Sequence, residues 1–208
     1  MAKGNYEGIY QPFKHWCEKG NIKFISDLHL GDDDMAWRGV CATDIIHTMN
    51  ESLRSGDTLV VLGDMGCYPG LFYNLLRKGV YKVLICGNHD KPYELRKFFD
   101  EVYTGGLQIS EKIYLSHEPT FVPGCLNIHG HDHGHAGVYC QILDDDGQTV
   151  IGAQYNLCCE GINYTPISLK QIQSLGYLKP IVTRHRQAID YQRMHSINPD
   201  KINEEVDE

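Results

Sequence analysis

Histidine, aspartate and asparagine side chains gather in five short clusters along this 208-residue sequence. The clusters are Asp27-Leu28-His29, Gly63-Asp64, Gly87-Asn88-His89-Asp90, His117 within LSHEP, and the tract NIHGHDHGH with His129, His131, His133 and His135. Imidazole nitrogens together with carboxylate and amide oxygens suit Mn, Fe, Zn or Ni better than Ca or Mg alone. The ligand types therefore indicate metal-assisted chemistry, and their number is sufficient for two ions.

Each cluster also has a simpler interpretation when it is taken alone. Asp27–His29 is compatible with a turn that carries a surface histidine, and Gly63-Asp64 uses residue types that favour turns for backbone reasons. His117 precedes a proline-driven bend, where a hydrogen-bonded histidine without chemistry is common. An alternating histidine tract can also bind metal adventitiously. The metal interpretation depends on all five clusters occurring together and in order.

Apolar, β-rich runs precede the first three clusters. Ile22–Asp27, Thr58–Asp64 and Val80–Asp90 each begin as a buried strand and end in polar residues. Between the first two runs, Ala42–Gly56 has apolar residues at helical spacing and predicts a crossover helix. Such units form sheets with parallel pairs, whose ligands bind outside the carboxyl ends of the strands. The clusters are expected to meet there.

The remaining elements follow from the same patterns. Pro69–Arg77 and Pro92–Phe99 predict short helices, and Ser168–Gly176 predicts a late helix with Ser168 as its N-cap. Further strands are expected at Ile109–Ser116, Leu126–His129, Val138–Leu143 and Thr149–Leu157, with a hairpin turn at Asp144–Gly147 between the last two. We expect a single domain over residues 1–208 with its core at about 22–176, and a loosely held polar tail over 184–208.

Composition excludes several functional classes. A formal charge of −8 argues against an extended nucleic-acid surface, since such binding depends on clustered Lys and Arg. No apolar run reaches the roughly 18–20 residues of a membrane span, and the first residues carry no signal-peptide pattern. The default expectation is a cytoplasmic protein without membrane contact. Eight cysteines without a CxxC pair favour reduced, mostly buried thiols.

The ordered clusters resemble the pattern of the calcineurin-like metallophosphoesterase superfamily, which runs D-x-H, G-D, G-N-H-D/E, H and G-H-x-H. The resemblance extends from about Ile22 to Leu169 and includes YNLCCEGINYTPISL near its end. The length of the chain and its LGD, GNHD and LSHEP motifs are most similar to those of the small stand-alone bacterial and phage-type members. The resemblance implies an α/β fold in which central mixed β-sheets pack as a sandwich flanked by helices, in αββα order.

The resemblance also implies which residues hold two metals. It assigns a first ion to Asp27, His29, Asp64 and His133. It assigns a second ion to Asp64, Asn88, His117 and His131, with Asp64 bridging the two. His89 would face the substrate, His129 would pack at a strand end, and His135 has no assigned role. Asp27 and Asp90 are candidates for orienting imidazoles.

The implied activity is a metal-dependent phosphoesterase in which a hydroxide bridging the two metals attacks phosphorus and His89 assists. Mn²⁺ is the expected ion, with Fe, Zn or Ni as alternatives. The acidic run Asp32–Asp34 would repel multiply charged phosphates, which favours a phosphodiester, either a small molecule or a nucleotide. Arg38 is either a bidentate phosphate ligand or an exposed arginine at a helix start.

Two other functions stay open at this stage. One is a phosphomonoesterase or nucleotide phosphatase of the same fold, and the other is a non-catalytic protein-binding scaffold. The sequence leaves the physiological substrate, the native metal and the oligomeric state undetermined.

Overall fold

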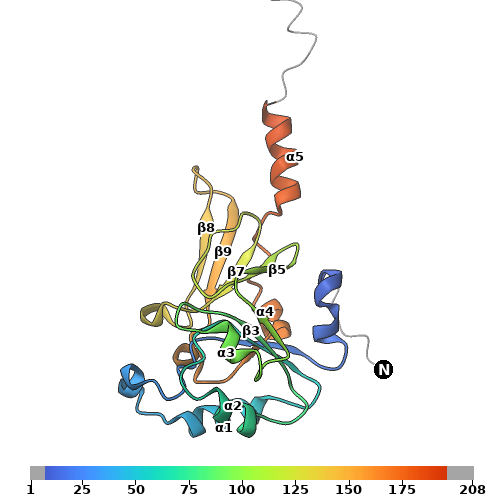
Figure 1. Cartoon of the computed structure of the whole chain (residues 1–208). Coiled ribbons are helices and arrows are strands. Elements are labelled where there is room, and N and C mark those ends of the chain that lie inside the picture. Colours follow the sequence, from blue (N-terminus) through green and yellow to red (C-terminus); the bar gives the residue numbers. More distant parts are fainter. Residues whose placement is uncertain (1–7, 196–208) are drawn as a thin grey trace, which may run out of the picture.

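A computed structural model of the chain describes residues 8–195 and shows an α/β architecture with two mixed five-stranded sheets flanked by helices (Figure 1). The strand order is β10-β1-β2-β3-β4 in the first sheet and β5-β6-β7-β9-β8 in the second. The expected α/β class with two mixed sheets is therefore confirmed at this level.

The first sheet is built from the predicted apolar runs. Its strands are β1 (Ile22–Ile25), β2 (Thr58–Val61), β3 (Tyr81–Ile85), β4 (Glu101–Tyr103) and β10 (Ile167–Ser168). The four strands from β1 to β4 are parallel, and β10 is antiparallel to β1. Every residue of β1 and β2 is buried, as expected for strands covered on both faces. Because Ile25 pairs with Val61 and Val61 with Leu84, the carboxyl ends of these strands lie level with one another.

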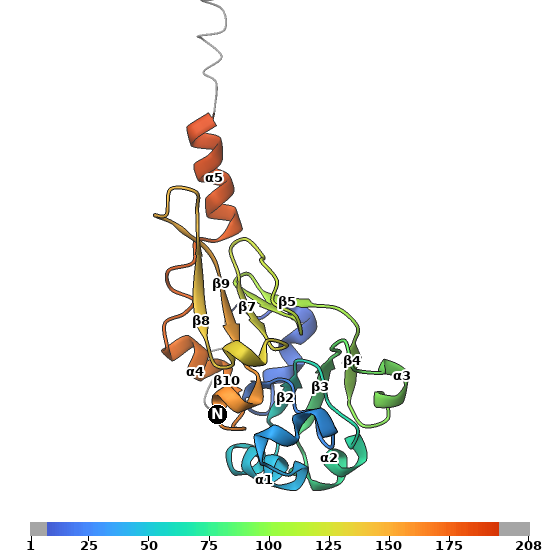
Figure 2. The same ribbon diagram turned by 90° about the vertical axis from the view of Figure 1, so that its left-hand side faces the viewer.

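Helices cover the first sheet. Helix α1 (Ala42–Ser52) buries Ile45, Ile46 and Met49 at helical spacing, and it lies beside α2 (Pro69–Leu75) along one side of the domain (Figures 1 and 2). Helix α3 (Pro92–Leu95) is shorter than predicted, because the chain continues from Leu95 as a tight turn in which Phe98 N–H bonds to its carbonyl. Two 3₁₀ helices, η1 (Gln11–Cys17) and η2 (Asp33–Arg38), complete this half.

The second sheet contains β5 (Leu107–Ser110), β6 (Ile113–Leu115), β7 (Leu126–His129), β8 (Tyr139–Leu143) and β9 (Val150–Asn156). The prediction of one strand over Ile109–Ser116 is wrong. The Ser110 hydroxyl accepts a hydrogen bond from Lys112 N–H, and the resulting turn folds β6 back against β5. The predicted hairpin turn at Asp144–Gly147 is confirmed by the bond from Gly147 N–H to the Asp144 carbonyl.

The late helix begins where the sequence predicts. Helix α4 (Leu169–Ser174) follows Ser168, whose hydroxyl accepts a hydrogen bond from Gln171 N–H. The Gln171 side chain in turn accepts one from Ser168 N–H, which completes a capping box.

The first part of the expected polar tail, Arg184–His195, forms helix α5. Thr183 caps the helix through its hydroxyl, Arg186 pairs with Asp190 one turn later, and Arg184 Nε donates to the Pro123 carbonyl. Figures 1 and 2 show α5 projecting beyond the end of the β8–β9 hairpin. The rest of the predicted tail, residues 196–208, lies outside the described residues. Within residues 8–195, none of the helices combines the length and apolar character needed to cross a membrane.

The two sheets join at the end of β1. Ser26 forms a parallel bridge with Cys158, in which Ser26 N–H bonds to the Leu157 carbonyl and Cys159 N–H bonds to the Ser26 carbonyl. Leu157 N–H bonds in turn to the carbonyl of His129 at the end of β7. The chain ends of β1, β7 and β9 therefore converge, although they are far apart in the sequence.

Candidate metal centre

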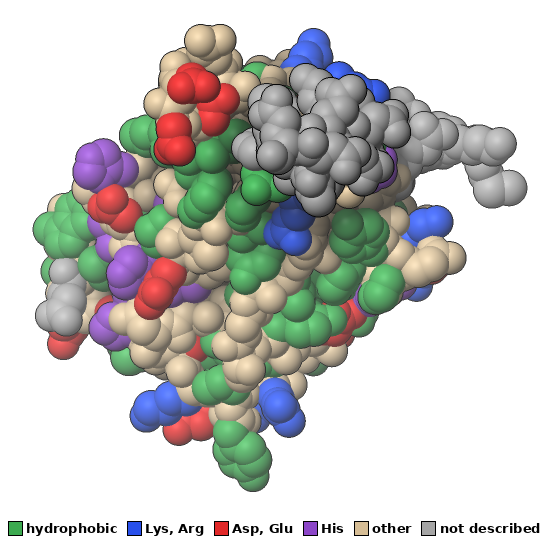
Figure 3. Space-filling model, turned by 90° about the horizontal axis from the view of Figure 1, so that it is seen from above, with side chains coloured by type: hydrophobic (Ala, Val, Ile, Leu, Met, Phe, Trp, Pro, Cys, Tyr) green, Lys and Arg blue, Asp and Glu red, His purple; other side chains and the backbone are tan. Residues whose placement is uncertain are grey.

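All five predicted clusters lie at the edge where the two sheets meet. Three of them follow β1, β2 and β3 of the first sheet, and two follow β6 and β7 of the second. The side chains that the sequence assigns to metals come from both sheets and are Asp27, His29, Asp64, Asn88, His117, His131 and His133. Figure 3 shows histidine side chains gathered beside acidic ones on one side of the face seen from above.

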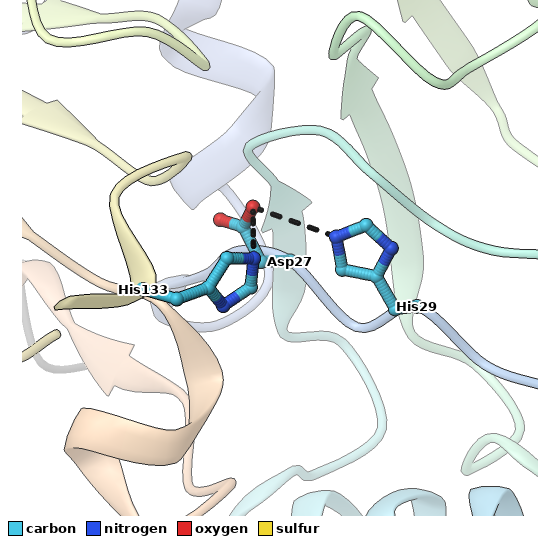
Figure 4. Close-up of side chains that lie close together, drawn as sticks. All are labelled: Asp27, His29 and His133. Atoms are coloured by element: carbon cyan, nitrogen blue, oxygen red, sulfur yellow. Dashed lines mark ion pairs between the residues drawn. The ribbon is translucent and has the colours of Figure 1, made fainter. Parts of the chain in front are cut away.

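Asp27, His29 and His133 form a first group of possible ligands, whose ligand atoms all lie within 4.8 Å of one another. Asp27 Oδ1 is 3.6 Å from His133 Nε2 and 3.9 Å from His29 Nε2. Both imidazole rings point toward the Asp27 carboxylate (Figure 4).

Asp64, His117 and His131 form a second group of the same kind. His117 Nε2 lies 3.4 Å from Asp64 Oδ2 and 3.1 Å from His131 Nδ1. The amide oxygen of Asn88 is 2.9 Å from the same His117 nitrogen. The other three residues assigned to the second ion therefore each place one atom within 3.4 Å of His117 Nε2.

Asp64 lies between the two groups. Its Oδ2 atom is 3.5 Å from His29 Nε2 and 3.4 Å from His117 Nε2. Its other oxygen accepts a hydrogen bond from His89 N–H at 3.1 Å. One carboxylate oxygen is thus within reach of both groups, which is the placement that a bridging ligand requires.

Four of these residues have backbone conformations that side chains rarely adopt. The φ angles are +57° at Asp27, +43° at His29, +52° at Asp64 and +70° at His131. Each left-handed residue of this kind costs on the order of 1–3 kcal/mol and persists only where surrounding contacts hold it. Such conformations cluster at functional sites, so their coincidence here supports a built site.

Asp90 holds the strained loops in place. Its carboxylate accepts hydrogen bonds from the backbone N–H groups of Asp64, Met65 and Gly87, each at 2.9 Å. The expectation that Asp90 orients an imidazole is therefore wrong, because its oxygens serve backbone amides.

Two glycines in the clusters are required by packing. A Cβ atom on Gly87 would lie 2.2 Å from Asp64 Oδ1, and one on Gly130 would lie 2.0 Å from Asp27 Oδ2. The glycines that precede Asn88 and His131 therefore let the loops approach close enough for their ligand atoms to meet.

The site fits a divalent cation on chemical grounds. Asp27 is fully buried, and its Oδ1 atom has no hydrogen-bond partner within the described part of the chain. A buried carboxylate oxygen without a partner is costly, and a cation coordinated there would satisfy it. Burial alone would lower the pKa of His117, but the hydrogen bond to Asp64 and the charges of Asp27 and Asp64 raise it to about 9. The unsatisfied oxygen and this negative field both favour a bound cation.

The ring nitrogens that face away from the centre have carboxylate partners. His29 Nδ1 lies 2.8 Å from Asp32 Oδ2, and His133 Nδ1 bonds to Glu160 Oε1. This arrangement fixes the orientation of a ligating histidine and makes it a better donor to a metal. Glu160 lies in the 3₁₀ helix η4 (Cys159–Ile162), directly after β9. Sequence reasoning missed it, although an acidic residue after a strand end is the signal that identified the other clusters.

Neither interpretation of Arg38 is correct. Its side chain is only 2% exposed, and it lies at the end of η2 rather than at a helix start. It donates to the carbonyls of Asp27 (2.9 Å) and Leu28 (3.1 Å) and pairs with Glu160 (3.0 Å). Arg38 is engaged in holding the first ligand loop and is not free to grip a phosphate.

His89 lines an open cleft that members of both groups also line. The cleft has a volume of about 1190 Å³, and its walls include His29, Asp64, His131 and His133. The His89 ring is exposed and lies 5.7 Å from the ring of His29, measured between centroids.

The outer two histidines of the alternating tract lie outside both groups. His129 is buried and bonds through Nδ1 to the Gly130 carbonyl, and burial lowers its pKa. His135 is exposed and pairs with Asp132. The structure therefore brings only His131 and His133 of this tract into the two groups.

Comparisons with known proteins add information on the fold. No family model matches the sequence, and no curated protein matches it. Among solved structures, the chain is similar to the crystal structure of a protein of unknown function from Aquifex aeolicus, with 25% sequence identity and a TM-score of 0.56. The similarity covers 74% of this chain and 98% of that chain. It is consistent with the α/β architecture.

Proposed function

We propose that this chain is a metal-dependent phosphoesterase that uses two divalent cations, with Mn²⁺ as the expected ion and Fe, Zn or Ni as alternatives. The observation that carries the proposal is the position of Asp64. Its Oδ2 atom lies 3.5 Å from His29 Nε2 of the first group and 3.4 Å from His117 Nε2 of the second group.

Each of the two ligand groups described above would hold one ion. Asp27, His29 and His133 would hold the first ion, Asn88, His117 and His131 the second, and Asp64 both. When bound, such a pair of cations lowers the pKa of a water molecule toward neutrality and neutralises the oxygens of a phosphoryl group. Asp27 and Asp64 would offset part of the positive charge of the two cations.

His89 is the candidate catalytic residue of the chain itself. Its backbone N–H is fixed by Asp64, and its ring is exposed in the cleft next to His29. From there the imidazole donates a proton to the leaving oxygen, or as imidazolium it stabilises charge on the phosphate. A positioned general acid contributes about 10²–10⁴-fold to the rate.

The charges of the cleft favour phosphodiesters over phosphomonoesters. Besides Asp64, the acidic side chains that line it are Asp32, Asp33, Asp90 and Glu94, whereas its Lys and Arg side chains are Lys91 and Lys97. A diester carries one negative charge, and a monoester carries up to two near neutral pH. The singly charged ester is repelled less by these carboxylates.

Hydrolysis of bis(p-nitrophenyl) phosphate and of p-nitrophenyl phosphate by metal-stripped protein refilled with Mn²⁺ tests the proposal. We expect the diester to be preferred, Asp64→Asn to lose at least about 100-fold in kcat/KM, and His89→Ala to lose about 10²–10⁴-fold. His89→Ala should still bind metal, because its ring belongs to neither ligand group. Full turnover by Asp64→Asn, or two bound Mn²⁺ without hydrolysis of either ester, would overturn the proposal.

A further inference from the structure

The cleft extends beyond the metal ligands into a second part with apolar walls. Met35, Pro69, Leu95 and Phe98 line this part together with Gly70, and we refer to these five residues as the apolar half. They come from η2, from α2 and from the segment at and after α3. The apolar half lines the same cleft as His89 and as members of both ligand groups.

The cleft is much larger than a phosphoryl group requires. Its volume of about 1190 Å³ exceeds the roughly 300–1,000 Å³ typical of pockets that bury a whole small molecule. A substrate whose phosphorus lies at the metals therefore leaves room elsewhere in the cleft for a large group on its ester oxygen.

Gly70 keeps the apolar half open against the ring of Phe98. A Cβ atom on Gly70 would meet only Phe98 carbons, at 3.8 and 4.0 Å, which is ordinary van der Waals contact. Gly70 lies in the first turn of α2, where a larger side chain is compatible with the helix. The space between residue 70 and the Phe98 ring therefore exists because residue 70 has no side chain.

Positive charge accompanies this aromatic face. Lys97 Nζ lies 5.0 Å from the centroid of the Phe98 ring. Lys91, on the same wall, is 75% exposed at its side chain and lies 3.7 Å from Glu94. Lys97 therefore lies over one face of the Phe98 ring, and an aromatic side chain with a cation next to it suits a planar heteroaromatic ring, which stacks on aromatic side chains and offers polar edges to a cation.

From these features we infer that the apolar half binds a heteroaromatic ring on the ester group, so that the preferred substrates are nucleotide-type phosphodiesters. The part of this inference that places the phosphoryl group at the metals rests on the proposed function. The ring-binding end rests on Gly70, Phe98 and Lys97, none of which belongs to the metal groups.

Direct binding to Mn²⁺-loaded protein separates the ring from the phosphate. Adenosine 5′-monophosphate and ribose 5-phosphate share the sugar and the phosphate and differ in the base, so their dissociation constants can be compared by calorimetry. We expect the adenosine compound to bind at least tenfold more tightly. Gly70→Leu should abolish this difference while leaving the affinity for ribose 5-phosphate unchanged.

Two further variants control the experiment. Asn74→Leu adds the same side chain to the same helix at an exposed position outside the cleft lining, and it should retain the tenfold preference. Phe98→Leu keeps apolar volume but removes the aromatic face, and it should reduce the preference. Equal binding of both compounds by the unmodified protein, or an unchanged preference in Gly70→Leu, would overturn the inference.

The calorimetry does not depend on turnover, so the two proposals can fail separately. A base preference without ester hydrolysis would remove the phosphoesterase proposal and leave the ring site. Hydrolysis of the diester without a base preference would remove the ring site and leave the phosphoesterase.

Discussion

His133 bonds through Nδ1 to the carboxylate of Glu160, while its Nε2 lies 3.6 Å from Asp27 Oδ1. The two residues are 27 positions apart and are brought together because β7, which precedes His133, pairs with β9, which precedes Glu160. The carboxylate fixes which ring nitrogen faces the centre. Glu160 therefore acts on the candidate metal site through His133 and does not face the ion itself.

Replacing Glu160 tests this positioning role. We expect Glu160→Gln to weaken Mn²⁺ binding by about 10–100-fold, because losing a carboxylate partner of a ligating histidine has effects of this size. Calorimetric titration of metal-stripped protein measures the affinity. Glu118→Gln, an exposed glutamate away from the cleft lining, is the matched control and should bind Mn²⁺ normally. Unchanged affinity in Glu160→Gln would show that the pair is only structural.

Arg38 is expected to contribute to stability rather than to substrate binding. Removing one partner of a buried charge pair costs about 3–5 kcal/mol, so Arg38→Ala should lower the free energy of unfolding by this order. Arg38→Lys should restore only part of it, since an ammonium group cannot reproduce the planar fork that reaches Asp27, Leu28 and Glu160 together.

Urea unfolding measures the effect of Arg38, and the exposed pair of Lys91 and Glu94 supplies the contrast. Lys91→Ala should change the free energy of unfolding by less than about 1 kcal/mol, as is usual for surface ion pairs. If Arg38→Lys lost all diester hydrolysis at unchanged stability, the structural role would be contradicted, and Arg38 would instead be assigned to substrate binding.

The raised pKa of His117 predicts a pH dependence of the metal-free protein. Burial opposes the shift, but the hydrogen bond to Asp64 and the charges of Asp27 and Asp64 raise the pKa from 6.5 to about 9. A group whose pKa rises on folding stabilises the fold while it is protonated. This stabilisation is complete below about pH 6.5 and is lost as pH rises through about 9, and it amounts to at most about 3 kcal/mol.

Urea unfolding of chelator-treated protein at several pH values between 6 and 10 checks this dependence. We expect the free energy of unfolding to fall across the interval, and to fall less in His117→Gln, which has no titrating group at that position. The difference between the two curves isolates the histidine from other titrations. Parallel curves would show that His117 does not carry the shift.

Much of the first sheet was predictable because its strands are continuous apolar runs. β1, β2 and β3 begin within one residue of the predicted starts, and the ligand clusters follow directly from their ends. The Ser168 N-cap was also predictable, because a capping box is formed by residues three positions apart. Features of this kind depend on residues that are close together in the sequence, so the sequence is sufficient to predict them.

The missed features depend on contacts between distant parts of the chain. Arg38 is buried because Glu160 approaches it from 122 positions away, and no local pattern distinguishes it from an exposed arginine. β4 (Glu101–Tyr103) has only three residues, all half-buried, so it lacks a periodic signal. The folding of 184–195 into α5 depends on Thr183 as a cap and on contacts with Pro123, which composition alone does not reveal.

The thiol of Cys158 borders the first ligand group without belonging to it. The Sγ atom donates to Asp27 Oδ2 at 3.2 Å, and burial together with the charge of Asp27 raises the thiol pKa. A protonated thiol is a poor metal ligand, and Mn²⁺ prefers oxygen and nitrogen. Asp27 Oδ2 also accepts a hydrogen bond from His131 N–H, so it keeps a partner when the thiol is removed.

We therefore expect Cys158→Ala to bind Mn²⁺ with an affinity within about threefold of the unmodified protein, since a buried protonated thiol contributes no ligand bond. Titration with Cd²⁺ at neutral pH gives an independent measurement, because cadmium–thiolate absorption appears only if the thiol is deprotonated and coordinated. Its absence, together with the retained Mn²⁺ affinity, would assign Cys158 to hydrogen bonding with Asp27. Cadmium–thiolate absorption that disappears in Cys158→Ala would instead make His133, Cys158 and Glu160 a third ligand group, since their ligand atoms also lie within 4.8 Å of one another.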